Sequence, residues 1–209
     1  MTTTISGTSG ITYPAGGTDN VAGSGVGTTD TQTLTNKTLS GATWTSPSSS
    51  TITSGTAQNS TSGTAILFTG IPSWAKRVTV MLSGISTNGT SIPQIQLGTS
   101  SGPTTTGYVG VVDGEVTAGG IAASLTTGLG LIRSGIAAAT NIISGQAVFT
   151  NVSGNNWVGI FVGGATTGGP AILWAATQIT LGATLDRVNI TTVNGTDTFD
   201  AGSINILYE

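Results

Sequence analysis

The sequence from Gly145 to Val162 reads Gly-Gln-Ala-Val-Phe-Thr-Asn-Val-Ser-Gly-Asn-Asn-Trp-Val-Gly-Ile-Phe-Val. Two runs of apolar and β-branched residues, 145–150 and 157–162, stand on either side of the polar turn Ser-Gly-Asn-Asn at 153–156. Short runs of this kind, bounded by Gly, Asn and Ser, are typical of β-strands. This stretch therefore predicts two strands separated by a turn.

The same pattern extends from residue 65 to residue 208. Eight further runs have the same character, at 65–69, 77–83, 94–97, 108–112, 128–132, 171–176, 187–193 and 204–208. In the last of them, Ile204, Ile206 and Tyr208 alternate onto one face, which predicts an interior strand rather than a frayed end. Ten short strands divided by Asn-Gly, Gly-Gly, Ser-Gly and Asp-Gly are typical of a β-sandwich.

The composition also favours an ordered all-β protein. Only 6% of the residues are charged, against about 25% in average globular proteins, and 37% are hydrophobic. Disorder usually combines low hydrophobicity with high net charge, whereas this chain has a net charge of −3 and a mean hydropathy of +0.26. Thr favours strands, and Gly, Asn and Ser favour turns.

The charge pattern argues against nucleic acid and membrane as partners. Nucleic-acid contacts need clustered cations, and only Lys76 and Arg77 are adjacent here. The segment 118–145 is rich in small residues, but glycines interrupt it and leave no run of about 20 apolar residues. We therefore expect buried strands in this segment and no membrane insertion.

The residues that support catalysis are scarce. There is no His or Cys, so Ser and Thr lack their commonest activating base. The close carboxylate pair Asp113-Gly-Glu115 is interpreted as a hairpin turn, because Asp-Gly is a strong turn dipeptide. Asp197 and Asp200 could supply oxygens to Ca²⁺, but further acidic ligands are missing, so turn chemistry is preferred. We expect no enzyme activity, no cofactor and no metal.

The sequence predicts that residues 1–55 form an extended arm, separate from the sandwich predicted at 56–209. The arm is rich in Gly, Thr and Ser, and its large apolar residues Leu34, Leu39 and Trp44 are each five positions from the next. One chain offers no second apolar face to bury them. Three copies of the chain around a threefold axis would bury them, because each Leu then meets the same Leu of the two other copies. These three residues are the predicted core of a homotrimer.

The arm also carries a specific likeness. Residues 29–39, Thr-Asp-Thr-Gln-Thr-Leu-Thr-Asn-Lys-Thr-Leu, closely resemble a motif of bacteriophage tail-fibre and related virion fibre proteins. A looser resemblance to phage tail proteins covers much of the rest of the chain, about residues 56–209, from the segment 63–80 to the closing segment 201–209. The resemblance implies a jelly-roll-like β-sandwich at the tip of a trimeric fibre. The arm would bind other virion proteins, and the tip would face the host surface and bind a glycan or protein there.

Two alternatives stay open. A capsid decoration or head-fibre protein would use the same arm to clamp capsomers, and the length of 209 residues favours it slightly because tail fibres usually have additional shaft. The less favoured alternative is a glycan-cleaving tail spike. Both alternatives still place the chain on the virion.

The tryptophans are the remaining candidates for contact with a receptor. We expect Trp174 in the core, Trp74 over a sandwich edge and Trp44 on the trimer axis. Two interpretations of Trp157 are open. It begins a buried strand, or its ring is exposed beside Asn155 and Asn156 and stacks on a sugar. Asn155, Asn156 and Trp157 are therefore the candidate receptor contacts.

Overall fold

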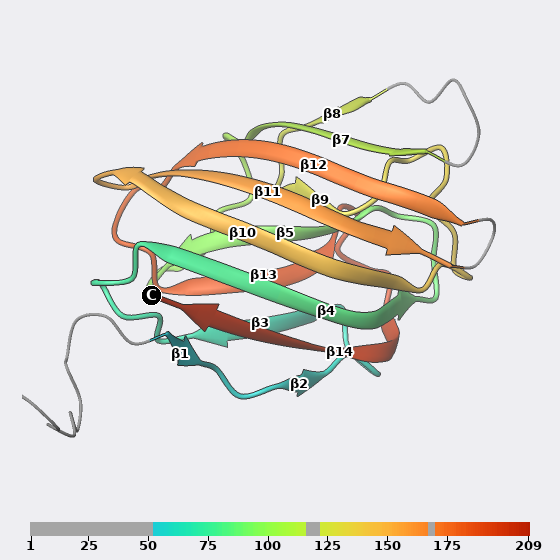
Figure 1. The fold of residues 1–209 in the computed structure, drawn as a ribbon, viewed down its shortest axis with the longest axis horizontal. Coiled ribbons are helices and arrows are strands. Elements are labelled where there is room, and N and C mark those ends of the chain that lie inside the picture. The colour runs from blue at the N-terminus through green and yellow to red at the C-terminus, as the bar shows by residue number, and fades with distance from the viewer. Residues whose placement is uncertain (1–51, 116–121, 167–169) are drawn as a thin grey trace, which may run out of the picture. The chain divides into compact units, whose positions relative to one another are not determined.

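A computed structural model describes residues 52–115, 122–166 and 170–209. These residues form fourteen strands and no helix, in two antiparallel sheets (Figure 1). The prediction of an all-β fold with a β-sandwich is therefore confirmed. Most of the predicted arm, including the trimer candidates Leu34, Leu39 and Trp44, lies outside the described residues.

The larger sheet has nine strands, and every neighbouring pair within it is antiparallel. Its order is β1 (Thr53–Ser54), β14 (Phe199–Tyr208), β4 (Arg77–Thr87), β10 (Ile143–Ser153), β11 (Asn156–Ala165), β12 (Ala171–Thr180), β7 (Val109–Glu115) and β8 (Ala123–Leu125), with β2 (Gln58–Asn59) also paired to β14.

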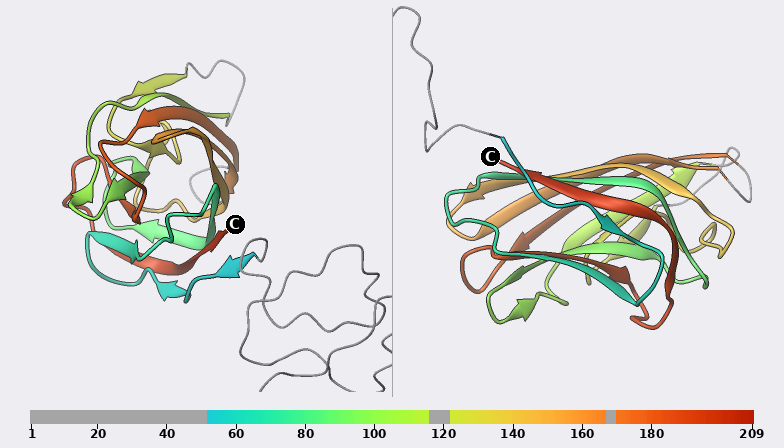
Figure 2. Two further views of the ribbon diagram at one scale, coloured as in Figure 1. Left: turned by 90° about the vertical axis from the view of Figure 1, so that its left-hand side faces the viewer. Right: turned by 90° about the horizontal axis from the view of Figure 1, so that it is seen from below.

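The smaller sheet has five strands, in the order β3 (Ala65–Thr69), β13 (Arg187–Thr192), β5 (Pro93–Thr99) and β6 (Gly102–Pro103), with β9 (Leu129–Gly130) also paired to β5. The chain crosses repeatedly between the two sheets (Figure 2). The large-sheet strand β4 follows β3 and precedes β5 in the sequence, and β14 follows β13, although β3, β5 and β13 all belong to the small sheet. The regular jelly roll has eight strands. The described residues instead form nine strands in one sheet and five in the other.

The core lies between the two sheets. Successive side chains of a strand point to opposite faces, and the buried residues follow that alternation. Val78 and Val80 of the large sheet are completely buried, as are Ile95 and Leu97 of the small sheet. Tyr108 enters the same core, where its hydroxyl accepts a hydrogen bond from the Leu97 amide at 2.7 Å and donates to the Leu97 carbonyl at 3.3 Å.

All ten predicted runs contain a strand, but two predictions about boundaries and turns are wrong. The sandwich begins before residue 56, because Thr53 pairs with Tyr208 and Ser54 with Leu207. Asp113 does not form a hairpin turn with Glu115. It lies within β7, opposite Trp174, because the ladder to β12 extends through it.

The closing strand β14 has neighbours on both sides, β4 along its length and the short β1 and β2 on the other edge. Ile204 and Ile206 are buried, which confirms the predicted interior strand. Tyr208 is half-buried, and its ring lies 5.8 Å from the ring of Trp74. Trp74 is itself 47% exposed, as expected for a side chain that covers an edge.

Candidate functional site: the outer face of the large sheet

Three neighbouring strands of the large sheet, β7, β11 and β12, carry large apolar residues on both faces. In β11 and β12, every second side chain enters the core, and the side chains between them are also largely apolar. Seven large hydrophobic residues on β7, β11 and β12 are therefore exposed on the outside. We call this set the apolar face: Val109, Val111, Val158, Ile160, Val162, Ile172 and Trp174.

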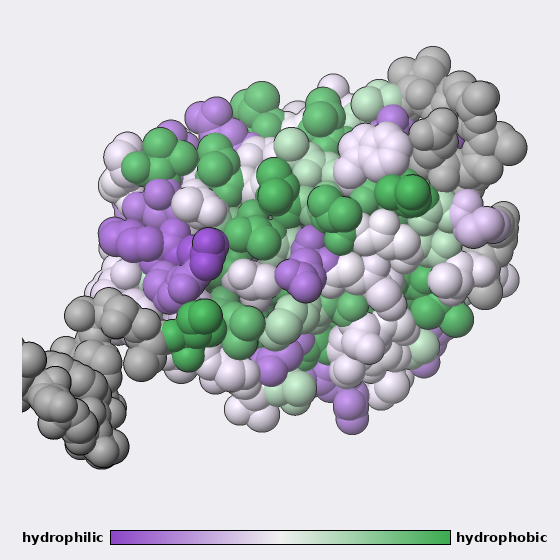
Figure 3. All heavy atoms as spheres, viewed as in Figure 1, coloured by the Kyte–Doolittle hydropathy of each residue, from purple (hydrophilic) through white to green (hydrophobic). Residues whose placement is uncertain are grey.

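The strand register makes the apolar face continuous. Val162 lies opposite Trp174, and Ile160 lies opposite Ala176, which in turn pairs with Val111. Trp174 is 41% exposed and Val109 is 74% exposed. Figure 3 shows hydrophobic atoms gathered over the middle of this sheet and hydrophilic atoms concentrated toward one end.

Charge is nearly absent from this part of the molecule. Strands β10, β11 and β12 contain no Asp, Glu, Lys or Arg. Asp113 of β7 is at the margin, where its carboxylate lies 3.6 Å from Arg133 Nε. The ion pair between Arg77 and Glu209 lies on β4 and at the C-terminal end of the chain.

An antiparallel sheet that covers a core on one side usually carries polar residues on the other, because that side meets water. A contiguous exposed apolar patch usually marks an interaction site. The apolar face fits another broad apolar surface, since the hollow beside Val109, Val111 and Ala176 is wide open and offers no deep pocket for a single side chain. It offers packing area and no group for acid, base or nucleophilic chemistry.

The structure buries one of the three predicted receptor contacts, Trp157, and leaves Asn155 and Asn156 partly exposed. Trp157 is 3% exposed and belongs to the core, so of its two readings the buried strand start holds and the sugar-stacking reading is wrong. Its Nε1 and the Oδ1 of Asn156 are buried without a hydrogen-bond partner among the described residues. Asn155 is half-buried in the turn between β10 and β11.

Trp174 is the opposite case, because the prediction that it lies in the core is wrong. Its neighbours Leu173 and Ala175 point inward, so Trp174 points outward. The sequence does not reveal the apolar face, because the run 171–176 is apolar at every position. Its pattern therefore does not indicate which of the two sets of alternating side chains faces the core.

The predicted turn carboxylate Asp197 does support a loop. Its two oxygens accept hydrogen bonds from the Ser91 amide at 2.9 Å and from Asn194 Nδ2 at 2.6 Å. Asp200 lies on β14 and is exposed. Within residues 52–115, 122–166 and 170–209, no three Asp, Glu, His or Cys side chains come together as a metal site would need.

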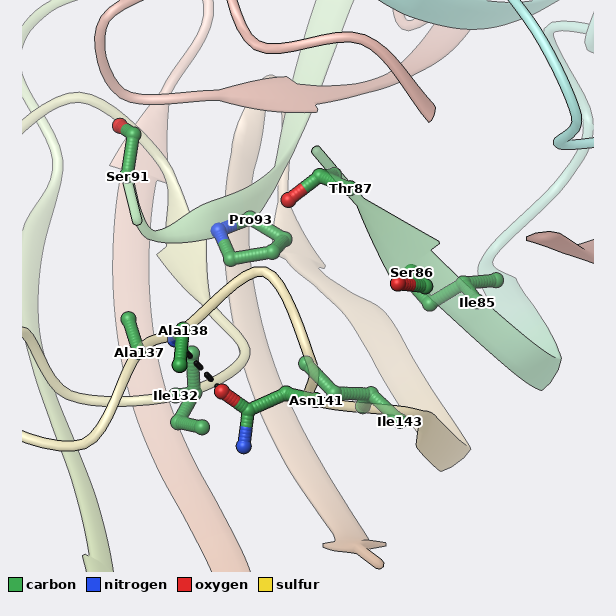
Figure 4. Close-up of a pocket in the computed structure, with 10 residues that line it drawn as sticks. All are labelled: Ile85, Ser86, Thr87, Ser91, Pro93, Ile132, Ala137, Ala138, Asn141 and Ile143. Carbon is green, nitrogen blue, oxygen red and sulfur yellow. Dashed lines mark hydrogen bonds between the residues drawn. The ribbon is translucent and has the colours of Figure 1, made fainter. Parts of the chain in front are cut away.

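A small cavity lies where the end of β4 meets the start of β5 and the segment before β10 (Figure 4). Its lining includes Ile85, Pro93 and Asn141, and Asn141 Oδ1 accepts a hydrogen bond from the Ala138 amide. The cavity volume is about 10 Å³. This is the space of about one water molecule, so the cavity does not fit an organic ligand.

Comparisons with protein-family models, with curated proteins and with solved structures found no match to this chain. The described part of the chain contains no helix that is long and apolar enough to span a membrane.

Proposed function

We propose that this protein is a structural component of a bacteriophage virion, a homotrimeric tail fibre whose C-terminal sandwich faces the host surface and binds a receptor there. The observation that carries the proposal is the close resemblance of residues 29–39 to the virion-fibre motif. The β-sandwich that follows this arm supports it, because such a domain is expected at a fibre tip. The N-terminal arm then binds other structural proteins of the virion.

The apolar face supports the trimer part of the proposal. Strands β10, β11 and β12 carry no charged residue, and Asp113 of β7 is paired with Arg133, so few like charges would meet when copies of this surface gather around a symmetry axis. Each half-exposed side chain contributes roughly 1 kcal/mol when a neighbour covers it. Trimerisation of the arm through Leu34, Leu39 and Trp44 would hold three sandwiches at a high effective concentration, which lowers the entropic cost of their contact. The occupant of the apolar face is therefore a sister sandwich.

The arm of the same chain is a weaker match to this face. Residues 1–51 are mainly Gly, Thr and Ser, and their few large apolar residues are widely spaced. A segment of this composition has no continuous apolar side to place against seven neighbouring hydrophobic residues. Sister sandwiches offer such a side: in a trimer, the apolar face of each copy can lie toward the threefold axis and meet parts of the apolar faces of both other copies.

A capsid decoration or head-fibre protein is the second candidate, and the length of the chain favours it. Both candidates use the same trimer and the same arm. A glycan-cleaving spike is less well supported, because Asp113 and Asp186 are paired with arginines and Asp197 is held within its loop. A retaining or inverting hydrolase needs two carboxylates that flank the substrate.

Labelling of intact phage particles with gold-conjugated antibody against residues 52–209 tests the proposal. We expect label at the distal end of tail fibres, and inhibition of adsorption by the same antibody. Label over the capsid would favour the head-fibre candidate, and no label on particles would contradict both. Release of reducing sugar from host polysaccharide by the purified protein would support the spike instead.

A further inference from the structure

The outer face of the small sheet differs sharply from the apolar face, because it is polar and hollowed. Strands β5 and β13 send Ile95, Leu97 and Ile190 into the core, and the residues between them point the other way. The outward set is Gln94, Gln96, Asn189 and Thr191. Each of them is at most 8% exposed although it points away from the core.

Hydrogen bonds fix these amide groups in place. Asn189 Nδ2 donates to Gln96 Oε1 at 3.0 Å, and Gln96 Nε2 donates to the Thr127 carbonyl at 2.9 Å. The Thr127 hydroxyl donates to Gln94 Oε1 at 2.7 Å, and the Thr191 hydroxyl donates to the Thr64 carbonyl at 2.8 Å. Asn189, Gln96 and Gln94 are thus connected through Thr127, and Thr191 is held separately by Thr64, so these side chains at the bottom of the groove have fixed donor and acceptor directions.

The walls of the hollow come from different parts of the chain. Pro103 and Thr105 form one side, and the turn 193–195 and Thr127 contribute others. The groove is open to solvent and has a volume of about 310 Å³, at the lower end of the range of roughly 300–1,000 Å³ for ligand sites. None of its lining residues is charged or aromatic.

Arg187 projects from the same side of β13 as Asn189, but its guanidinium is already engaged in hydrogen bonds within the protein. Its guanidinium bonds the Asp186 carboxylate and the Ser100 carbonyl, each at distances of 2.8–3.1 Å. An anionic ligand would therefore find no free cation in the lining. An apolar ligand would leave Gln94 Nε2 and Asn189 Oδ1 without a partner, because neither atom has a hydrogen bond within the described residues. A ligand rich in hydroxyls and without charge satisfies both conditions.

We infer that the groove over β5 and β13 is a binding site for an uncharged oligosaccharide segment. Planar amides offer a donor and an acceptor together, and adjacent sugar hydroxyls use such pairs. The inference rests on the proposed function, since it names the ligand class of the receptor-binding tip. The groove lies on the opposite side of the sandwich from the apolar face, so assembly through that face leaves three grooves open.

This geometry predicts weak binding by one groove and strong binding by the assembly. The lining has no aromatic ring on which a sugar can stack, so a single groove gains little beyond its hydrogen bonds. Three linked grooves raise the overall affinity through effective concentration, provided that the host surface presents the sugar repeatedly.

Nuclear magnetic resonance of the full-length protein tests the site through its side-chain NH₂ signals. The probes are maltotriose, mannotriose and chitotriose, with trigalacturonic acid as the charged comparison. We expect one of the neutral sugars to shift the amide signals of Gln94, Gln96 and Asn189, and the charged sugar to leave them unchanged.

The variant Thr105→Glu places a charge at the exposed wall and should weaken the binding at least tenfold. Thr69→Glu makes the same change on the same sheet outside the groove and should leave the binding unchanged. No shift with any neutral sugar, or equal weakening by both variants, would overturn the inference. The trimer mass and the particle labelling are separate readouts, so a groove that binds none of these sugars would leave the proposed function standing.

Discussion

Tyr108 shows how one buried polar side chain joins the two sheets. Its hydroxyl contacts both backbone groups of Leu97 on β5, while its own position leads directly into β7. A buried amide and carbonyl that lose their partner cost more than an ordinary hydrogen bond contributes, because they remain out of contact with water.

We therefore expect Tyr108→Phe to lower the free energy of unfolding by about 1–3 kcal/mol. Tyr208→Phe is the matched control, since Tyr208 is half-buried and no hydrogen bond of its hydroxyl is present in the described structure. Denaturant unfolding followed by fluorescence measures both. Equal effects of the two substitutions would contradict the role of the Tyr108 hydroxyl.

The same residue predicts an alkaline limit to stability. Burial raises the pKa of the Tyr108 phenol, and the hydrogen bond with Leu97 only partly opposes this. Above the ordinary Tyr pKa of about 10, the unfolded chain loses this proton while the folded chain keeps it. The unfolded state then binds fewer protons, so the free energy of unfolding falls as pH rises. Tyr108→Phe should show a shallower fall between pH 10 and 11, and an identical slope would contradict the assignment.

At the scale of elements, strands were predictable where alternation or composition is strong and were missed where pairing alone creates them. The run 77–83 alternates clearly and became part of β4. The two-residue strands β1, β2 and β6 carry no apolar pattern and exist because a long neighbour offers its edge. The dipeptide Asp113-Gly favours a turn locally, but its ladder with β12 overrides that preference.

The two surfaces were predictable to different degrees for a physical reason. A run that is apolar at every position, such as residues 171–176 of β12, predicts burial but does not indicate which face meets the core. The exposure of Trp174 therefore became visible only from the strand register and the burial pattern. The groove combines Gln94 with Asn189, which are almost a hundred residues apart. Only the pairing of β5 with β13 brings them together.

The closing strand gives a direct test of an element. Removal of residues 204–209 deletes the buried Ile204 and Ile206 and exposes the edge of β4. Each buried side chain contributes roughly 1.5–3 kcal/mol, and a whole domain is stable by about 5–15 kcal/mol. We expect insoluble protein after expression, measured by the soluble fraction. A soluble product with an unchanged melting temperature would contradict the interior position of β14.

For the molecule as a whole, the arm and the sandwich should have separable roles. Removal of residues 1–51 leaves every described strand intact, so the domain should fold with an unchanged far-ultraviolet circular dichroism spectrum. Its trimers should dissociate on dilution because the tether is gone, and it should not be incorporated into particles. A variant that enters particles normally would show that the arm is not the attachment segment.

The apolar face should hold the sandwiches together. Ile160→Glu puts an unpaired charge at the middle of this face, which costs about 3–5 kcal/mol if it is buried between copies. We expect weaker association with the fold retained, whereas Thr69→Glu on the small sheet should leave association unchanged. Analytical ultracentrifugation of the protein without residues 1–51 measures both. The same dissociation constant for both variants would show that the face does not meet a sister copy.

The molar mass of the full-length protein in solution, measured by light scattering over a range of concentrations, is the most direct test of the trimer. We expect three times the 20.6 kDa mass of one chain at every concentration, because the arm and the apolar face both join the copies. A mass of one chain throughout the range would contradict the trimer and, with it, the proposed fibre.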